Sequence, residues 1–172
     1  MHKKRVIQVG VICLLLAIAF SVGGCFPSRS TIEAEVYTVL NRLEYAMLSK
    51  DIDLILMCYT DPFYFYSGGQ VSSITHYQLR SELTDFFKNR SGYYELYELR
   101  EPLPYKLGLT EAKVTCDLHI KRYSSTNGYE QASFDLEYTL VKHLGHWKIR
   151  QIVNRNPVSV SQTLSILGLP QE

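Results

Sequence analysis

Alternation of apolar and polar residues in the second half of the chain limits what it can fold into more than any other feature. Two successive segments carry apolar residues at every second position: Val114, Cys116, Leu118 and Ile120 in the first, and Phe134, Leu136, Tyr138 and Leu140 in the second. A period of two is the pattern of a strand with one buried face. The two segments are therefore predicted to be neighbouring strands of an antiparallel sheet.

The register of these two strands is also predictable, because a shift by one residue would place apolar side chains opposite polar ones. All the apolar positions are even, so the numbers of two facing residues must add up to an even number. A three-residue loop, Thr126-Asn127-Gly128, satisfies this condition and puts glycine where such loops need a left-handed backbone. This loop pairs Leu118 with Leu136.

The opposite face of the same strands collects acidic and histidine side chains: Asp117, His119, Asp135 and Glu137. On the predicted register His119 faces Asp135, an arrangement typical of metal ligands. The next hairpin, with a four-residue loop over 142–145, pairs Leu140 with Trp147 and brings Arg150 opposite Glu137. A solvated, partly ion-paired face is therefore favoured, and no metal or cofactor is predicted.

The first half of the folded part is predicted to be mainly helical. Ser30-x-x-Glu33 and Thr75-x-x-Gln78 are capping-box patterns, each of which indicates the start of a helix. Asp51 is expected to cap a shorter helix from Ile52 to Tyr59, and Phe63 to Ser67 is strand-like. Further strands are expected over Tyr93–Arg100, Tyr105–Leu109, Ala112–Tyr123, Tyr129–Val141 and Trp147–Val153. Helices followed by an antiparallel meander predict an α+β fold.

The N-terminus has the pattern of a targeting segment. Lys3, Lys4 and Arg5 precede an uncharged stretch from Val9 to Phe20, and its roughly 12 apolar residues are too few to span a bilayer. Val22-Gly23-Gly24-Cys25 resembles the lipobox of bacterial lipoproteins. The resemblance implies cleavage of residues 1–24 and acylation of Cys25, which would tether the domain through residues 25–29 to the cell membrane or the outer membrane.

Charge excludes one class of partner. Three of the 18 Lys and Arg residues lie in the targeting segment, which leaves 15 against 17 Asp and Glu in the rest of the chain. Without a basic surface, nucleic-acid binding is not expected. The mature part also keeps two cysteines besides Cys25. An extracytoplasmic location permits a disulfide between Cys58 and Cys116, and the alternative is two buried free thiols.

The order of elements, with Tyr59-Thr60-Asp61-Pro62-Phe63 before the aromatic strand and Gly145-His146-Trp147-Lys148-Ile149 in the last hairpin, resembles the nuclear-transport-factor-2-like (SnoaL-type, cystatin-like) superfamily. The resemblance covers Thr31 to Arg155, and implies a domain over 30–155 followed by a tail over 156–172. It implies a cone in which helices pack in the concave face of a curved antiparallel sheet, often around a pocket. Some members are ketosteroid isomerases or dehydratases, and others only bind ligands or partners.

The catalytic residues of ketosteroid isomerases do not carry over to this chain. Where they have a carboxylate base, this sequence reads Tyr66-Ser67-Gly68-Gly69, and their first-helix tyrosine falls near Leu43. Asp61 and His76 could serve another chemistry, but are more often turn and helix-start residues. We therefore expect a non-catalytic binding domain, with an enzyme as the alternative.

Several expectations follow for sites and partners. Tyr64, Tyr66, Tyr138 and Trp147 are the candidates for pocket lining, with plain core packing as the alternative. The partner would be a small amphipathic ligand or an envelope protein, and a homodimer is a further candidate assembly. In the tail, Val160, Leu164 and Leu167 follow Pro157 at helical spacing and predict a short helix that caps the cone or contacts a partner.

Overall fold

The structure is a computed structural model and describes residues 27–156. The predicted targeting segment, the acylation site at Cys25 and the tail after Asn156 lie outside the described residues. The helical elements are α2 (Arg29–Ser49), α3 (Ile52–Met57), α4 (His76–Thr84) and a π-helical turn η1 (Asp85–Asn89). The strands are β1 (Tyr59–Ser67), β2 (Gln70–Ile74), β3 (Tyr93–Leu107), β4 (Glu111–Ser124), β5 (Gly128–His143) and β6 (His146–Asn154).

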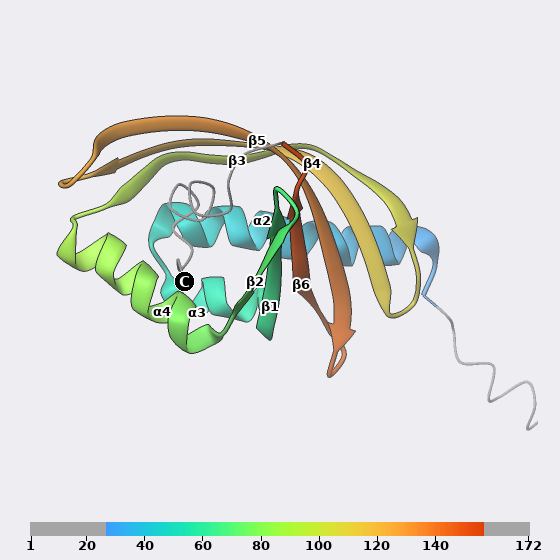
Figure 1. Ribbon diagram of the computed structural model, residues 1–172. Coiled ribbons are helices and arrows are strands. Elements are labelled where there is room, and N and C mark those ends of the chain that lie inside the picture. Colours follow the sequence, from blue (N-terminus) through green and yellow to red (C-terminus); the bar gives the residue numbers. More distant parts are fainter. Residues whose placement is uncertain (1–26, 157–172) are drawn as a thin grey trace, which may run out of the picture.

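All the strands form a single curved sheet, in the order β2-β1-β6-β5-β4-β3. The meander from β3 to β6 is antiparallel, as predicted, and β1 joins it through a parallel pairing with β6. Figure 1 shows the sheet arching over α2, with α3 and α4 on the same concave side. The predicted α+β fold, with helices in the concave face of a curved sheet, is confirmed.

The inner and outer faces of β4 and β5 are those expected from the sequence, but the register differs by two residues. Leu118 pairs with Phe134, not with Leu136. The turn occupies residues 125–127, and Gly128, with φ +73°, closes it as the first residue of β5. The backbone N–H and the hydroxyl of Ser125 both donate to the Arg90 carbonyl, at 2.8 Å each. This contact with a residue outside the hairpin fixes the turn one residue before the predicted loop.

The hairpin between β5 and β6 also differs from the prediction. Its turn has two residues, Leu144 and Gly145, both with positive φ, as in the turns that match the twist of a hairpin. Trp147 therefore pairs with Lys142, not with Leu140. A bulge at Arg150 then shifts the alternation of inward and outward side chains by one residue. Ile149 before the bulge and Ile152 after it are therefore both buried.

The helix starts were predicted with mixed success. Asp51 caps α3, and Thr75 caps α4 in a capping box with both hydrogen bonds formed. The cap of α2 is Ser28, whose side chain accepts from the Thr31 N–H, and not Ser30. The two segments predicted on either side of Pro102 are one strand, β3, which tolerates proline because it is an edge strand.

The core lies between the concave face of the sheet and the helices. The apolar side of α2 is buried in it, with side chains at helical spacing: Ile32, Val36, Val39, Leu40, Leu43 and Met47. Within residues 27–156, no helix is long and apolar enough to cross a membrane.

Candidate functional site

An enclosed space lies between α2, α3, α4 and the concave face of the sheet. Its lining is apolar and aromatic: Met47, Ile55, Tyr59, Leu79, Leu83, Tyr97, Tyr138 and Ile152. The cavity volume is about 10 Å³, which is room for about one water-sized sphere. The side chains around this cavity therefore leave almost no free space in it.

Three tyrosines carry the hydroxyl groups among the described residues that line this cavity. Tyr59, Tyr97 and Tyr138 are all buried, and the hydroxyls of Tyr97 and Tyr138 are hydrogen-bonded to each other. Burial raises the pKa of all three phenols above the ordinary value of 10. They stay protonated at neutral pH and can donate hydrogen bonds, but cannot act as bases.

The predicted pocket residues divide into two groups. Tyr138 lines the central cavity, and Trp147 is buried but faces a different groove. Tyr64 and Tyr66 do not line either of these two pockets as residues 27–156 describe them, and their role in a pocket stays a prediction. In β1 the inner positions are taken by Phe63 and Phe65, which are completely buried, so the alternating tyrosines project from the outer face of the sheet.

Trp147 lies close to the turn of the β5–β6 hairpin, where the hairpin packs against the N-terminal half of α2. Its indole Nε1–H donates to the Glu35 carboxylate at 2.7 Å, and the Lys142 ammonium donates to the same oxygen at 3.0 Å. These two donors, Lys142 foremost, hold the pKa of Glu35 below its ordinary value. The neighbouring surface groove has a volume of about 180 Å³ and is lined also by Arg42 and His146.

Asp61 and His76 have structural roles. The Asp61 carboxylate accepts the backbone N–H of His76 at 3.0 Å, and the His76 ring lies 3.2 Å from the Tyr59 carbonyl. Both interactions join the start of α4 to β1. Neither side chain is among those that line the cavity.

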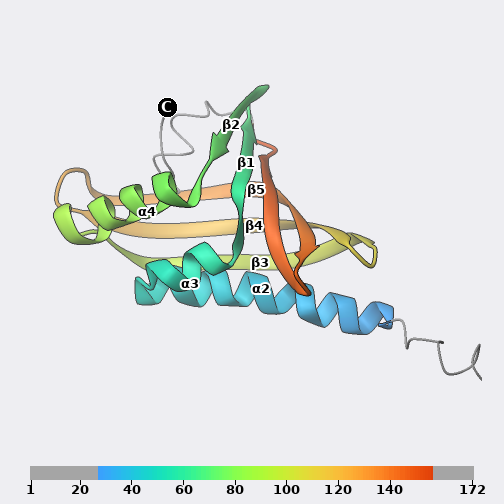
Figure 2. The same cartoon turned by 90° about the horizontal axis from the view of Figure 1, so that it is seen from below.

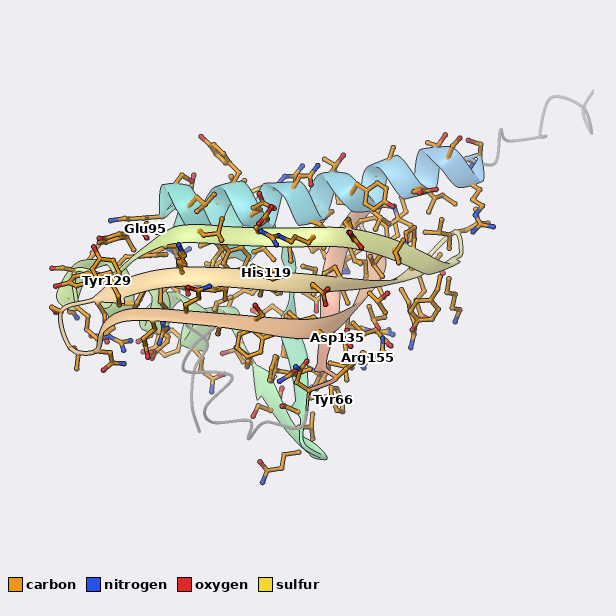
Figure 3. All side chains as sticks on the ribbon, turned by 90° about the horizontal axis from the view of Figure 1, so that it is seen from above. Tyr66, Glu95, His119, Tyr129, Asp135 and Arg155 are labelled. Atoms are coloured by element: carbon orange, nitrogen blue, oxygen red, sulfur yellow. The ribbon has the colours of Figure 1, made fainter. Side chains whose placement is uncertain are left out.

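The polar cluster on the outer face has other partners than the sequence suggested. Asp117 is opposite Asp135, and His119 is opposite Ser133, whose hydroxyl lies 3.1 Å from the His119 ring. Figure 3 shows His119, Asp135 and Arg155 on this face, away from the helices. Arg155 pairs with Asp135 at 3.7 Å. Over residues 27–156 no group of three metal-binding side chains comes together.

Cys58 and Cys116 are free thiols in the structure, and both are buried. The Cys58 carbonyl accepts from Ile149 of β6, and β5 lies between β6 and β4, which carries Cys116. Three strand spacings of about 4.8 Å separate the two backbones, beyond the roughly 7 Å that a disulfide can bridge. Burial raises the pKa of each thiol to about 12, so neither is a nucleophile at neutral pH.

No protein-family model matches the sequence, and no curated protein is similar to it in sequence. Solved structures do share its architecture. A nuclear-transport-factor-2-like superfamily protein from Salmonella enterica superposes with a TM-score of 0.60 at 17% identity, over 77% of this chain and 96% of the other. The chain has the nuclear-transport-factor-2-like fold.

Two further structures support the same assignment. A ketosteroid isomerase-like protein from Erwinia carotovora atroseptica matches with a TM-score of 0.52 at 19% identity, over 74% of this chain and 96% of the other. A protein with a cystatin-like fold from Nostoc punctiforme matches at 0.52 and 12% identity, over 71% of this chain and 88% of the other. At such identities the likeness to nuclear-transport-factor-2-like proteins establishes the fold alone.

Sequence reasoning missed two of the tyrosines that line the cavity, and the contact that Glu35 makes with Trp147. Tyr97 follows the same alternation as Tyr94 only if a bulge interrupts β3 between Tyr94 and Leu96. Local pattern does not reveal a bulge. Tyr59 follows the C-cap residue of α3, Cys58, and was predicted to be the last residue of that helix, so its position as the first residue of a strand was not visible.

Proposed function

We propose that this chain is a membrane-tethered extracytoplasmic lipoprotein whose domain is non-catalytic and acts by binding a protein partner in the envelope. The observation that carries the proposal is the filled interior. A ligand pocket normally needs a few hundred cubic ångströms, whereas the central cavity here holds about 10 Å³. Among residues 27–156, those that line it supply phenols and no carboxylate, imidazole or thiol.

The partner surface is proposed on the outer face of the sheet, where exposed aromatic and apolar side chains gather. This outer-face patch consists of Tyr64, Tyr66, Val71 and Tyr105, which are 37–54% exposed. Tyr66 is paired with Val71 of β2 and with Val153 of β6. Tyr105 hydrogen-bonds Glu137, which is in turn opposite Val153. Tyrosines at an exposed, partly apolar face are typical of protein interfaces.

Site-specific crosslinking in intact cells tests the partner surface. A photoreactive residue at Val71, which pairs with Tyr66 and is 51% exposed, is expected to capture a membrane or envelope protein. The double variant Tyr64→Ser, Tyr66→Ser with the same photoreactive residue is expected to lose that partner without a change in thermal stability. The matched control is Tyr77→Ser, because Tyr77 is 82% exposed on α4, away from the patch. Equal capture by wild type and the double variant would contradict the proposal.

The tether is tested separately. Cys25→Ser is expected to abolish incorporation of a fatty-acid analogue and to leave the precursor uncleaved, because the resemblance makes this thiol the acceptor of the lipid. Equal labelling of the variant and the wild type would show that the chain is held in another way.

A further inference from the structure

The end of the molecule where α2 begins also carries two exposed leucines in turns. Leu144, in the β5–β6 turn, is 87% exposed, and Leu109, between β3 and β4, is 47% exposed. Turns normally carry polar residues or glycine at such positions. We name these two turns, together with the first turn of α2, the anchor end.

Hydrogen bonds hold the three parts of the anchor end together. Lys142, in the second residue pair from the β5–β6 turn, donates its backbone N–H to the Thr110 carbonyl in the β3–β4 turn at 2.9 Å. Its ammonium donates to Glu35 of α2, which lies six residues, or about 9 Å, along the helix from Arg29. Figure 2 shows the hairpin ending beside the N-terminal half of α2.

The distance from the anchor end to the proposed acylation site is short. Cys25 precedes Arg29 by four residues, and four extended residues span at most about 14 Å. If Cys25 is acylated, the first turn of α2 is confined to that distance from the bilayer. The turns that project beside α2 are then held at the membrane surface at a high effective concentration, so that weak contacts suffice.

The charges at the anchor end suit a bilayer with anionic headgroups. The Glu35 carboxylate is ion-paired with Lys142 and accepts a hydrogen bond from Trp147, and Glu111 is ion-paired with Lys106 and Arg150. Lys148, in contrast, has no ion-pair partner within residues 27–156, and His143 and His146 flank Leu144 on the exposed turn. An exposed apolar side chain on the same hairpin as a lysine that has no ion-pair partner among the described residues suits the interface of a membrane with anionic lipids.

We infer that the anchor end rests on the bilayer, with Leu144 and Leu109 inserted at the level of the headgroups. This inference rests on the proposed lipid tether and adds an orientation to it. The β4–β5 turn is then held away from the lipid, because it lies at the opposite end of β5 from the β5–β6 turn.

The test uses the full-length chain, processed and acylated in cells, purified and reconstituted into vesicles of phosphatidylglycerol and phosphatidylethanolamine. An environment-sensitive fluorophore is attached at Leu144→Cys or, as the matched control, at Thr126→Cys in the exposed β4–β5 turn. Cys58 and Cys116 are buried and should not react in the folded protein. Unsubstituted protein measures any background labelling.

A blue shift and protection from an aqueous quencher at position 144, but not at 126, would support the orientation. Equal quenching at both positions in protein whose Cys25 is acylated, as shown by its intact mass, would overturn the inference and leave the tether intact. Equal protection at both positions would overturn it too, since the domain would then have no defined orientation. Absence of the acyl group would refute the tether itself, and the inference with it.

Discussion

Thr139 carries a buried hydroxyl for which residues 27–156 supply no hydrogen-bond partner. An unsatisfied buried hydroxyl is destabilising, and valine has nearly the same shape without it. Thr139→Val is therefore expected to raise the free energy of unfolding by about 1 kcal/mol, measured by chemical denaturation. The control is Thr60→Val, which removes a hydroxyl that donates to the Pro62 carbonyl at 2.7 Å and should lower stability. A loss of stability in both variants would mean that Thr139 has a partner.

Glu35 is expected to give the protein part of its sensitivity to acid. Its pKa is held below the ordinary 4.5 by hydrogen bonds from Lys142 and Trp147. The unfolded state therefore binds more protons than the folded state between the two pKa values. The stabilisation is complete above pH 4.5 and is lost as the pH falls through the folded pKa.

Glu35→Gln should remove that part of the pH dependence, with an effect of about 1 kcal/mol or less because the side chain is partly exposed. Chemical denaturation at a series of acidic pH values measures it. Lys142→Met should remove most of the same slope, since Lys142 is the larger cause of the shift. A Glu35→Gln profile that runs parallel to the wild type would exclude this role for Glu35.

At the scale of single elements, the two capping boxes in the sequence have different outcomes in the structure. Thr75 accepts from the Gln78 N–H at 3.2 Å, and the Gln78 side chain accepts from the Thr75 N–H at 2.9 Å. Thr75→Ala is expected to lower the free energy of unfolding by about 1 kcal/mol. Ser30→Ala should have almost no effect, because Ser28 caps α2. Equal losses in thermal or chemical denaturation would show that the α2 cap is assigned to the wrong serine.

The elements themselves were largely predictable from local pattern. The faces of β4 and β5 follow from their alternation, and the start of α3 follows from Asp51. Turn positions were not predictable, because loops over 125–127 and 126–128 both keep apolar residues opposite each other. Contacts with other parts of the chain decide between them, as the hydrogen bond from Ser125 to the Arg90 carbonyl does. Strand β2 was missed because it is short, with five residues, and most of them are polar.

For the whole molecule, the order of elements was enough to predict the cone. The parallel pairing of β1 with β6 was not, since it joins segments far apart in the chain and has no local signal. The filled interior was equally hidden. Whether a cone keeps a pocket depends on how Met47 from α2, Tyr97 from β3 and Tyr138 from β5 pack against one another, and no single residue shows it.

The central claim is that a lipid-tethered domain with a filled interior acts through its surface. The most direct measurement is native mass spectrometry of the wild-type protein extracted from membranes, compared with the same sample after denaturation. Both spectra should give the mass of a chain that begins at Cys25 and carries acyl groups, with no additional small molecule bound in the native spectrum. A stoichiometric small molecule that leaves on denaturation, or an unmodified chain that still begins at Met1, would contradict the account.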